Sequence, residues 1–542
     1  MPELDLLITN AAVFDGRSLL PDADTVAVHG GRIVAVGGSG RLESFGTVRQ
    51  TVDAGGALVH PGFTDAHVHP AQAGLEMLGC DLSSARSRDE TVALVRRYAA
   101  KHPNDSWILG AGWQTTHFGP DGPRARFLDA AAPGRAIMLT DAGHHAAWMS
   151  SEALRRLGID AATPDPTDGW IARDAGEPTG VVHEGAMEIG RGRIPAPPAS
   201  RIAEGVVAAQ DVLFGYGVTG WQDAIVGDYA DSVDSTDGYH LAASDGRLKA
   251  RVTAALWLDR SSVDRDPVAV AAELAGRRAR FESVGDGRLT APAVKVMLDG
   301  VVEARTAALK EPYSDGPAPE GHFTAATLAP IAVELVRQGF QLHFHAIGDA
   351  ALQTALDVVE TAHGVRRLRH HIAHLQVVDP ADIPRMARLA VVANLQMLWA
   401  CHDAQNLAVC RPALGETRYL SRQYPFASFA RAGVALAAGS DWPVTTADPW
   451  AAIAVGVTRV LAGEAVTEPL EPEEALPLDL ALAAHTRGSA EIVGDEEGGR
   501  IEPGARADLV LLDSDPFRAD PADLHRVRAV GTWVAGEQVA GR

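Results

Sequence analysis

Six residues whose side chains can hold metal ions are spread through the chain, each at or near the end of a short apolar run. They are His67, His69, Lys295, His345, His374 and Asp441. Imidazole and carboxylate groups are ligands that suit zinc and other first-row divalent metals. Side chains two positions apart on a strand point to one face, so both histidines of HVH can approach the same ion. The set indicates hydrolytic chemistry, because a bound cation makes water acidic enough to attack near neutral pH.

Each of these residues also has an ordinary explanation when it is taken alone. A strand histidine can be a hydrogen-bonded core group, and Asp441 could cap the helix that follows GSD. A single lysine on an apolar strand usually extends its amine to solvent. What favours a metal site is that all six stand in strand positions that one architecture would bring together.

That architecture follows from the apolar pattern between the two ends of the chain. Short apolar runs alternate with Ala-rich helical segments, which is typical of βα units. Eight runs are predicted barrel strands: 62–69, 217–224, 251–258, 293–300, 340–349, 369–378, 391–399 and 434–444. We therefore predict an α/β fold, a (β/α)₈ TIM barrel. Active sites of such barrels lie at the C-terminal ends of the strands, where the six residues would converge.

Both chain ends have a different pattern from the middle. Residues 1–60 and 491–542 contain short alternating strands with tight turns, each stretch too short for its own core. We expect them to form one small β-sandwich domain, with the barrel spanning 61–490. The interval 71–200 is too long for one crossover helix and is predicted to be an inserted, lid-like subdomain after strand one. The Pro-rich run 194–200 would lead back to the barrel.

Composition excludes several classes of function. The formal net charge of -22 repels phosphate backbones and anionic membranes, so we expect neither a nucleic acid nor a membrane partner. No apolar run is long enough to span a bilayer, and the first residues lack the pattern of a secretory signal. Three cysteines do not make a disulfide framework. The sequence favours a cytoplasmic enzyme with a small-molecule substrate, and homodimerisation is expected by analogy with other barrels.

The apolar runs and their polar ends carry a family resemblance. PGFTDAHVHP, VKVMLDG, HAIGDAA, IAHLQ and GSDWPV lie between an opening LITNAAVFDG and a closing GGRIEPGARADLVLLDSDP. With these segments the chain resembles the amidohydrolase superfamily, specifically its amidohydrolase 3 or YtcJ-like branch, which includes N-substituted formamide deformylases. The resemblance covers essentially the whole chain, and its motifs are specific for the branch rather than for a substrate.

The resemblance implies roles for the metal-site residues. His67 and His69 would hold the more buried metal with Asp441, and His345 and His374 would hold a second one. One or two Zn²⁺ ions are implied, with Mn²⁺ or another first-row metal as alternatives. The reaction would be hydrolysis of a non-peptide, amide-type C–N bond in a small organic molecule. Asp441 would take a proton from the attacking water and pass it to the departing nitrogen.

Lys295 falls where many members carry a lysine that reacts with carbon dioxide on N6. The carbamate so formed bridges two metals. Burial beside cations favours this chemistry, because it lowers the pKa of an amine and stabilises the anionic product.

Six further residues are candidates for the substrate pocket: Trp113, His144, His145, Arg305, Trp399 and Trp442. His145 aligns best with a family histidine that follows a glycine and is a candidate catalytic residue, with His144 as its neighbour. The tryptophans could form an apolar wall. Ordinary core packing is an equal explanation for Trp113. Arg305 could bind a carboxylate or carbonyl of the substrate, or instead pair with Glu303 or Asp299.

Two other functions remain alternatives at this point. A mononuclear deaminase acting on a heterocycle is disfavoured by Lys295, which deaminase branches usually lack. A catalytically silent scaffold relative is disfavoured because all six ligand positions carry chemically competent residues.

Overall fold

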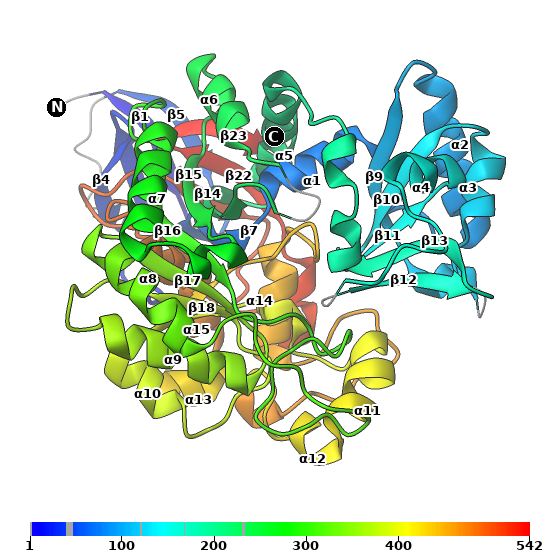
Figure 1. Cartoon of the computed structure of the whole chain (residues 1–542). Coiled ribbons are helices and arrows are strands. Elements are labelled where there is room, and N and C mark those ends of the chain that lie inside the picture. Colours follow the sequence, from blue (N-terminus) through cyan, green and yellow to red (C-terminus); the bar gives the residue numbers. More distant parts are fainter. Residues whose placement is uncertain (1–2, 39–46, 120–121, 167–168, 230–232, 542) are drawn as a thin grey trace.

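A parallel eight-stranded sheet occupies the centre of the molecule (Figure 1). The computed structural model describes residues 3–38, 47–119, 122–166, 169–229 and 233–541. Consecutive strands pair in sequence order, all in parallel. The strands are β7 (Phe63–Val68), β14 (Val218–Val226), β15 (Arg251–Trp257), β16 (Leu289–Met297), β17 (Gln341–Ala346), β18 (His371–His374), β19 (Val392–Leu395) and β20 (Leu436–Ala438). The predicted barrel strands are thereby confirmed.

Backbone hydrogen bonds join the end of the first strand to the loop that follows the last strand. The amide of Asp441 donates to the carbonyl of His67 at 2.7 Å, and the amide of His69 donates to the carbonyl of Trp442 at 2.9 Å. These bonds close the sheet into a barrel at the edge where its carboxyl ends meet. They also place residues of strands one and eight next to each other.

Helices surround the barrel and bury one face against it (Figure 1). They are α5 (Ala199–Gly215), α6 (Thr236–Ser244), α7 (Pro267–Phe281), α8 (Ala325–Arg337), α9 (Asp349–Ala362), α10 (Ile383–Leu389), α13 (Phe426–Arg431) and α14 (Pro449–Thr458). Helix α8 shows why these segments are helical. Thr324 and Thr327 form a capping box at its start, and Leu328, Ile331 and Leu335 recur at helical spacing on the buried face.

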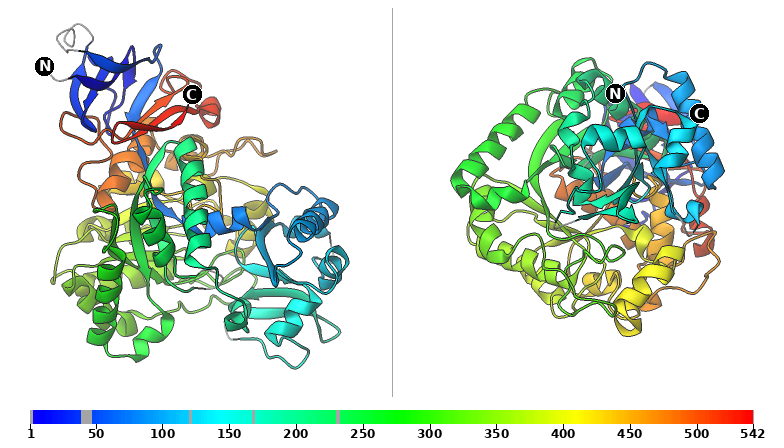
Figure 2. Two further views of the ribbon diagram at one scale, coloured as in Figure 1. Left: turned by 90° about the horizontal axis from the view of Figure 1, so that it is seen from above. Right: turned by 45° about the vertical axis from the view of Figure 1, so that its right-hand side comes forward.

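Two small sheets that contain both chain ends form a sandwich on one side of the barrel (Figure 2). One sheet consists of β1 (Leu4–Thr9), β3 (Thr25–His29), β4 (Arg32–Gly37) and β5 (Val48–Asp53). The other consists of β2 (Ala12–Val13), β6 (Leu58–Pro61), β21 (Leu509–Leu512), β22 (Ala529–Val534) and β23 (Glu537–Gly541). Alternation puts Leu4, Leu6 and Ile8 of β1 inside, so the sandwich has its own core.

The segment after strand one forms a separate α/β layer, seen at the right of Figure 1. Its sheet has the order β12-β13-β11-β10-β9-β8. Its elements are α1 (Pro70–Leu78), β8 (Cys80–Asp81), α2 (Arg88–Lys101), β9 (Trp107–Trp113), α3 (Ala125–Ala131), β10 (Ala136–Asp141), β11 (Ala146–Met149), α4 (Ser151–Leu157), β12 (Gly169–Asp174) and β13 (Glu177–Glu184). This is the predicted inserted subdomain.

The insert joins the barrel through two helices in close contact. A Cβ added to Gly74 of α1 would lie only 1.9 Å from the carbonyl oxygen of Gly205 in α5. Glycine at both positions therefore lets the two backbones touch where the chain leaves and re-enters the barrel.

No helix of the described segments is both long and apolar enough to cross a membrane. All three cysteines, Cys80, Cys401 and Cys410, are buried free thiols.

Candidate metal centre

The barrel brings the six predicted metal-site residues to its carboxyl edge. His67, Lys295, His345 and His374 lie on β7, β16, β17 and β18. His69 follows β7 directly, and Asp441 lies in the loop just after β20. All are buried except His69, whose side chain is 13% exposed. Residues that are scattered in the sequence thus form one polar site at the end of the barrel.

Asp441 lies at the middle of this cluster. Its Oδ1 is 3.4 Å from His67 Nε2 and 3.1 Å from His69 Nε2. Lys295 Nζ is 3.5 Å from His67 Nε2, which places the lysine amine beside the same pair.

The donor atoms fit a divalent cation. Ligand atoms of His67, His374 and Asp441 lie within 4.8 Å of one another. The ring of His345 lies 4.5 Å from that of His374, centroid to centroid. Among the described residues, Nδ1 of the buried His374 has no hydrogen-bond partner. A buried nitrogen without a partner is costly, and a cation at this point would satisfy it.

Two histidines of the cluster are oriented by groups that the sequence analysis did not assign. His67 Nδ1 is 2.9 Å from His343 Nε2, and His345 Nδ1 is 3.1 Å from Asp299 Oδ1. In each case one ring nitrogen is held and the other stays available, the arrangement typical of metal-binding histidines. For His67 the available Nε2 faces Asp441. The signal for Asp299 was its place just after β16, in MLDG.

Asp299 is itself held rigidly. It is fully buried and accepts hydrogen bonds from the backbone amides of Ala308, Ile347 and Gly348 at 3.1, 3.0 and 2.8 Å. Its carboxylate therefore links the loop after β16 to the end of β17.

Burial and mutual contact fix the charge states in the cluster. Burial and the neighbouring Lys295 hold the pKa of His67 well below its ordinary value, so this ring is neutral and able to bind a cation. Burial alone would raise the pKa of Asp441, but hydrogen bonds from His67 and His69 hold it well below the usual range. Burial lowers the pKa of Lys295 to about 7, so much of its amine is neutral at physiological pH.

The backbone at two ligands adopts a conformation that residues with side chains rarely use. The φ angles are +79° at His374 and +59° at Asp441. Hydrogen bonds hold both positions: the amide of His374 donates to Gln396 Oε1 at 2.6 Å, and that of Asp441 to the carbonyl of His67. Such strain is concentrated at functional sites, where neighbouring structure fixes it.

The two histidines of the insert differ in their surroundings. His145 Nδ1 is 3.1 Å from Glu184 Oε1, and its side chain is 39% exposed. Burial would lower the pKa of His145, but the hydrogen bond with Glu184 outweighs it and raises this pKa to about 9. Glu303, from the barrel loop after β16, raises the pKa of His145 further. His144 Nδ1 instead lies 2.8 Å from Gln72 Nε2.

The remaining predicted pocket residues divide between the site and other places. Trp399 stacks on His374, with ring centroids 5.2 Å apart and an interplanar angle of 8°. Trp442 is partly buried next to Asp441. Arg305 pairs with Asp315 at 2.7 Å, a partner that the sequence analysis did not consider.

Trp113 is a correction to the predicted pocket. It is fully buried in the core of the insert against Phe118 and Trp148, and its Nε1 donates to the carbonyl of Leu139 at 2.7 Å. Packing between the insert's sheet and its helices therefore uses this ring. The residues that line the cavity described next include none of the six predicted pocket residues.

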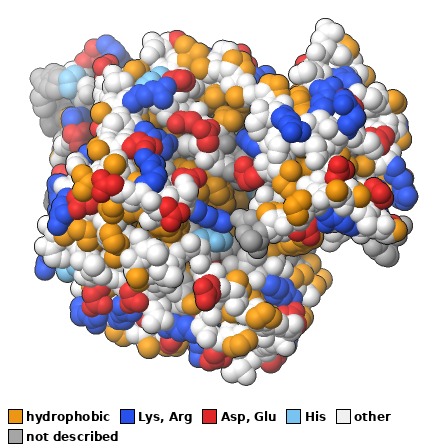
Figure 3. All heavy atoms as spheres, in the orientation of Figure 1, with side chains coloured by type: hydrophobic (Ala, Val, Ile, Leu, Met, Phe, Trp, Pro, Cys, Tyr) orange, Lys and Arg blue, Asp and Glu red, His pale blue; other side chains and the backbone are white. Residues whose placement is uncertain are grey.

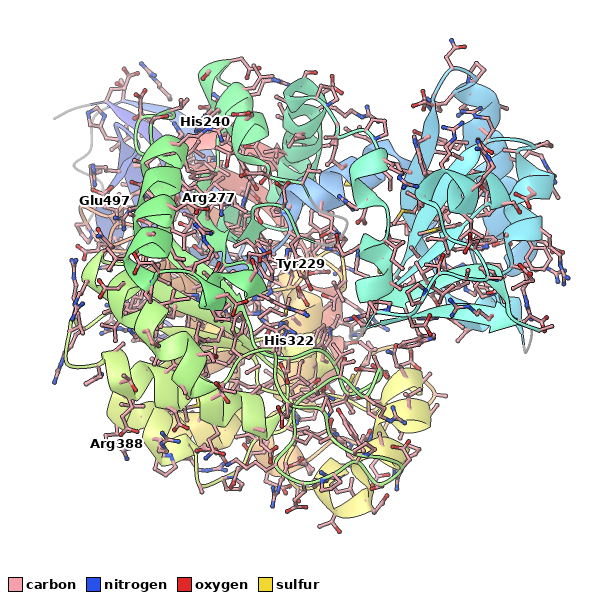
Figure 4. The ribbon with its side chains drawn as sticks, viewed as in Figure 1. Tyr229, His240, Arg277, His322, Arg388 and Glu497 are labelled. Atoms are coloured by element: carbon pink, nitrogen blue, oxygen red, sulfur yellow. The ribbon has the colours of Figure 1, made fainter. Side chains whose placement is uncertain are left out.

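A cavity of about 810 Å³ between the barrel and the insert reaches the metal-site cluster at His69. Figure 3 shows the surface hollowed between these two parts. The walls of this cavity are mainly apolar. The insert and the barrel both contribute apolar side chains to them: Leu75, Met138, Ile194, Ile202, Ile225 and Val233. Loops after β14 and β16 carry Tyr229 and His322, which in Figure 4 lie toward the middle of the view, whereas Arg388 lies at the outer edge.

Comparison with known proteins places the chain in a family. Residues 50–540 match the model of the Amidohydrolase family. The chain belongs to that family. YtcJ of Bacillus subtilis is 30% identical over 524 residues, covering 95% of this chain and 96% of that protein. The N-substituted formamide deformylase of Arthrobacter pascens is 28% identical over 559 residues, covering 98% and 97%.

A solved structure supports the same assignment. The amidohydrolase superimposes on an uncharacterised metal-dependent hydrolase from Pyrococcus horikoshii with a TM-score of 0.75 and 25% identity, covering 95% of this chain and 99% of that one. The family, the barrel and the His-His-Asp cluster agree, and the protein is a metal-dependent hydrolase of the amidohydrolase superfamily.

Proposed function

We propose that this amidohydrolase cleaves an amide-type, non-peptide C–N bond of a small neutral molecule, with N-substituted formamides as the first candidates. The observation that carries the proposal is the cluster of buried candidate ligands together with a mainly apolar cavity of about 810 Å³ that is lined by His69. A cavity of this size suits a small organic molecule whose apolar part is removed from water. The similarity to the Arthrobacter pascens deformylase supports this class of substrate.

We further propose that the cluster holds two divalent cations, Zn²⁺ or another first-row metal, with Lys295 carboxylated on N6. Such cations would supply water of lowered pKa and positive charge opposite the substrate's carbonyl oxygen. Lys295 supports the proposal because its amine is buried, partly neutral at pH 7 and 3.5 Å from His67 Nε2. Attack of the neutral amine on carbon dioxide forms an N–C bond and releases one proton, leaving a carbamate anion.

The residues of this chain divide the remaining work between them. The carboxylate of Asp441 takes a proton from the attacking water and delivers it to the departing nitrogen, which could not leave as an anion. His145, protonated at neutral pH through its contact with Glu184, donates a hydrogen bond to the substrate from Nε2. Trp399 packs on His374 and excludes water from that side of the cluster.

The proposal is tested by incubating zinc- or manganese-loaded protein with a panel of N-formyl, N-acyl and cyclic amides and measuring amine release. We expect turnover of at least one N-formyl amine, and we expect metal loading to raise the melting temperature. His67→Ala and Asp441→Ala should each lower turnover more than about a hundredfold while the protein stays folded. Less than one bound metal per chain, or no amine from any member of the panel, would refute the proposal.

A further inference from the structure

One carboxyl group on the wall of the cavity has no part in the mechanism above. Asp223 lies on β14, the second barrel strand, and both Asp223 and His69 line the cavity. In the sheet, Asp223 is the register partner of Val68, which stands between His67 and His69 on the neighbouring strand. The carboxyl group therefore shares this cavity with His69, the metal-site residue that lines it.

The hydrogen bonds of Asp223 leave part of its acceptor capacity unused. Tyr239 donates its hydroxyl to Oδ2 at 2.7 Å, and the backbone amide of Ile225 donates to Oδ1 at 3.2 Å. A carboxylate can accept about four hydrogen bonds. Asp223 is only 2% exposed. Among the described residues, no lysine or arginine forms an ion pair with it.

A buried carboxylate with incomplete partners is costly and is retained where it meets a donor. The lining of the same cavity includes the apolar side chains of Ile225, Ile202 and Val233. A ligand that fills this part of the cavity must bring its own N–H or O–H to this point.

We propose that Asp223 accepts the N–H of the scissile amide and so selects secondary amides over tertiary ones. The inference rests on the proposed function. A formamide has only one carbon on its acyl side, so a substrate with its carbonyl at the cluster extends its nitrogen side into the cavity. The N-substituent then lies on the apolar wall, and the nitrogen passes beside Asp223.

The competing interpretation is that Asp223 only anchors Tyr239, which is the fully buried phenol of α6. Tyr239→Phe removes the same hydrogen bond but leaves the carboxylate in the cavity. It is therefore the matched control for Asp223→Asn. An anchoring role predicts that both variants lose stability together and treat all substrates alike.

The experiment compares wild type, Asp223→Asn and Tyr239→Phe, all metal-loaded, on N-benzylformamide and N-benzyl-N-methylformamide. We expect Asp223→Asn to lower kcat/KM for the secondary amide about 10- to 100-fold, as for loss of a hydrogen bond to a charged group, and to change the tertiary amide less than about threefold. Where the tertiary amide is not turned over, its inhibition constant against the secondary one takes the place of kcat/KM. Tyr239→Phe should keep the wild-type ratio.

Metal content and melting temperature are measured on all three proteins. Equal losses on both amides in Asp223→Asn, or the same change of ratio in Tyr239→Phe, would overturn the proposal. If metal-loaded wild type cleaves neither amide, the proposed function fails by itself, and calorimetric binding of the two amides then decides the role of Asp223. Tighter binding of the secondary amide that is lost in Asp223→Asn supports it, and any other pattern, including no binding, overturns it.

Discussion

At the scale of single residues, two histidines of the cluster have one ring nitrogen held by a neighbour, which leaves the other for a cation. His343 holds His67, and Asp299 holds His345. Affinity for metal therefore depends on residues that do not touch it. His343 is neutral, since burial holds its pKa well below the ordinary value. Of the two supporting residues, His343 and Asp299, only Asp299 is acidic. Its effect on metal affinity can therefore be tested by replacing the carboxylate with an amide.

Asp299→Asn should weaken metal binding about 10- to 100-fold, because the neutral amide is a poorer acceptor for the N–H of His345. Titration of metal into the apo protein, followed by calorimetry, measures the change. Asp315→Asn is the control, because Asp315 pairs with Arg305 in the same loop but is not hydrogen-bonded to a ligand. Unchanged affinity in Asp299→Asn, or an equal loss in the control, would contradict the assignment.

Lys295→Met should reduce the metal bound per chain by about one equivalent, because the apolar side chain cannot form a bridging carbamate. Short carboxylic acids should partly restore the second metal and the turnover. Metal analysis by mass spectrometry, with and without added formate or acetate, is the measurement. Two metals per chain in the variant would rule out the bridging role.

Residue type and strand position made it predictable that the six candidate ligands converge, because barrel geometry gathers strand ends at one edge. Asp299 and Asp223 were not recognised, because what distinguishes them is burial and partners contributed by distant segments. Trp113 and Trp399 look alike in the sequence, yet one packs inside the insert and the other stacks on a ligand. Arg305 pairs with Asp315, and local sequence offered nearer acids that it does not use.

At the scale of elements, strands were predictable from apolar runs, but not all of their ends were. Strand β16 begins at Leu289, four residues before the expected start, and contains Pro292. Its pairing with β15 shifts register between Thr253 and Ala255, opposite Thr290 and Ala293, so the proline lies in the irregular part. Proline has no backbone N–H to donate to a neighbouring strand, so in the sequence it suggests the start of the strand. In the structure the bulge accommodates Pro292 and the strand continues through it.

Gly74→Ala should loosen the connection between insert and barrel, because the new methyl group would collide with the backbone of α5 at Gly205. Overpacking of this kind costs about 1–3 kcal/mol. Limited proteolysis should cut between barrel and insert faster than in wild type, and the melting temperature should fall.

Gly215→Ala is the matched control, since it lies in α5 and a Cβ there meets no atom within 4 Å. It should be neutral or slightly stabilising, because alanine favours a helix by up to about 1 kcal/mol. Similar behaviour of the two variants would show that the contact between α1 and α5 is not tight.

At the scale of the whole molecule, the barrel floor meets the sandwich through a group of buried rings. His60 of β6 lies 4.4 Å from Phe63, and His485 lies 6.0 Å from the same ring, centroid to centroid. Burial lowers the pKa of His60 to about 4 and that of His485 to about 3. Among the described residues, Nε2 of both histidines lacks a hydrogen-bond partner. Both imidazoles at the contact between the barrel and the sandwich are therefore uncharged at neutral pH.

This contact should make the fold sensitive to acid. Unfolded histidine takes up a proton near pH 6.5, while folded His485 stays neutral down to about pH 3, so stability is lost as the pH falls between these values. Between pH 7 and 5 the loss from His485 is at most about 2 kcal/mol. In His485→Leu the melting temperature should fall less over this range than in wild type.

Thermal melts are recorded with a chelator present, so that release of metal by acid does not contribute. His29→Leu serves as the control, because the His29 side chain is 45% exposed. It should keep the wild-type dependence on pH. Parallel curves for wild type and His485→Leu would show that this histidine is not responsible.

The sheet that combines β2 and β6 with β21, β22 and β23 has a consequence for synthesis. Strand β6 pairs in parallel with β2, and on its other side with β21, which is made only when nearly the whole chain has left the ribosome. At 5–20 residues per second the early strands wait on the order of half a minute or longer for that neighbour. During this time Leu58 and Val59, both fully buried in the finished protein, face water along an open strand edge. Newly made protein should therefore depend on chaperones more than its finished stability suggests, and slowing translation before residue 509 should increase aggregation.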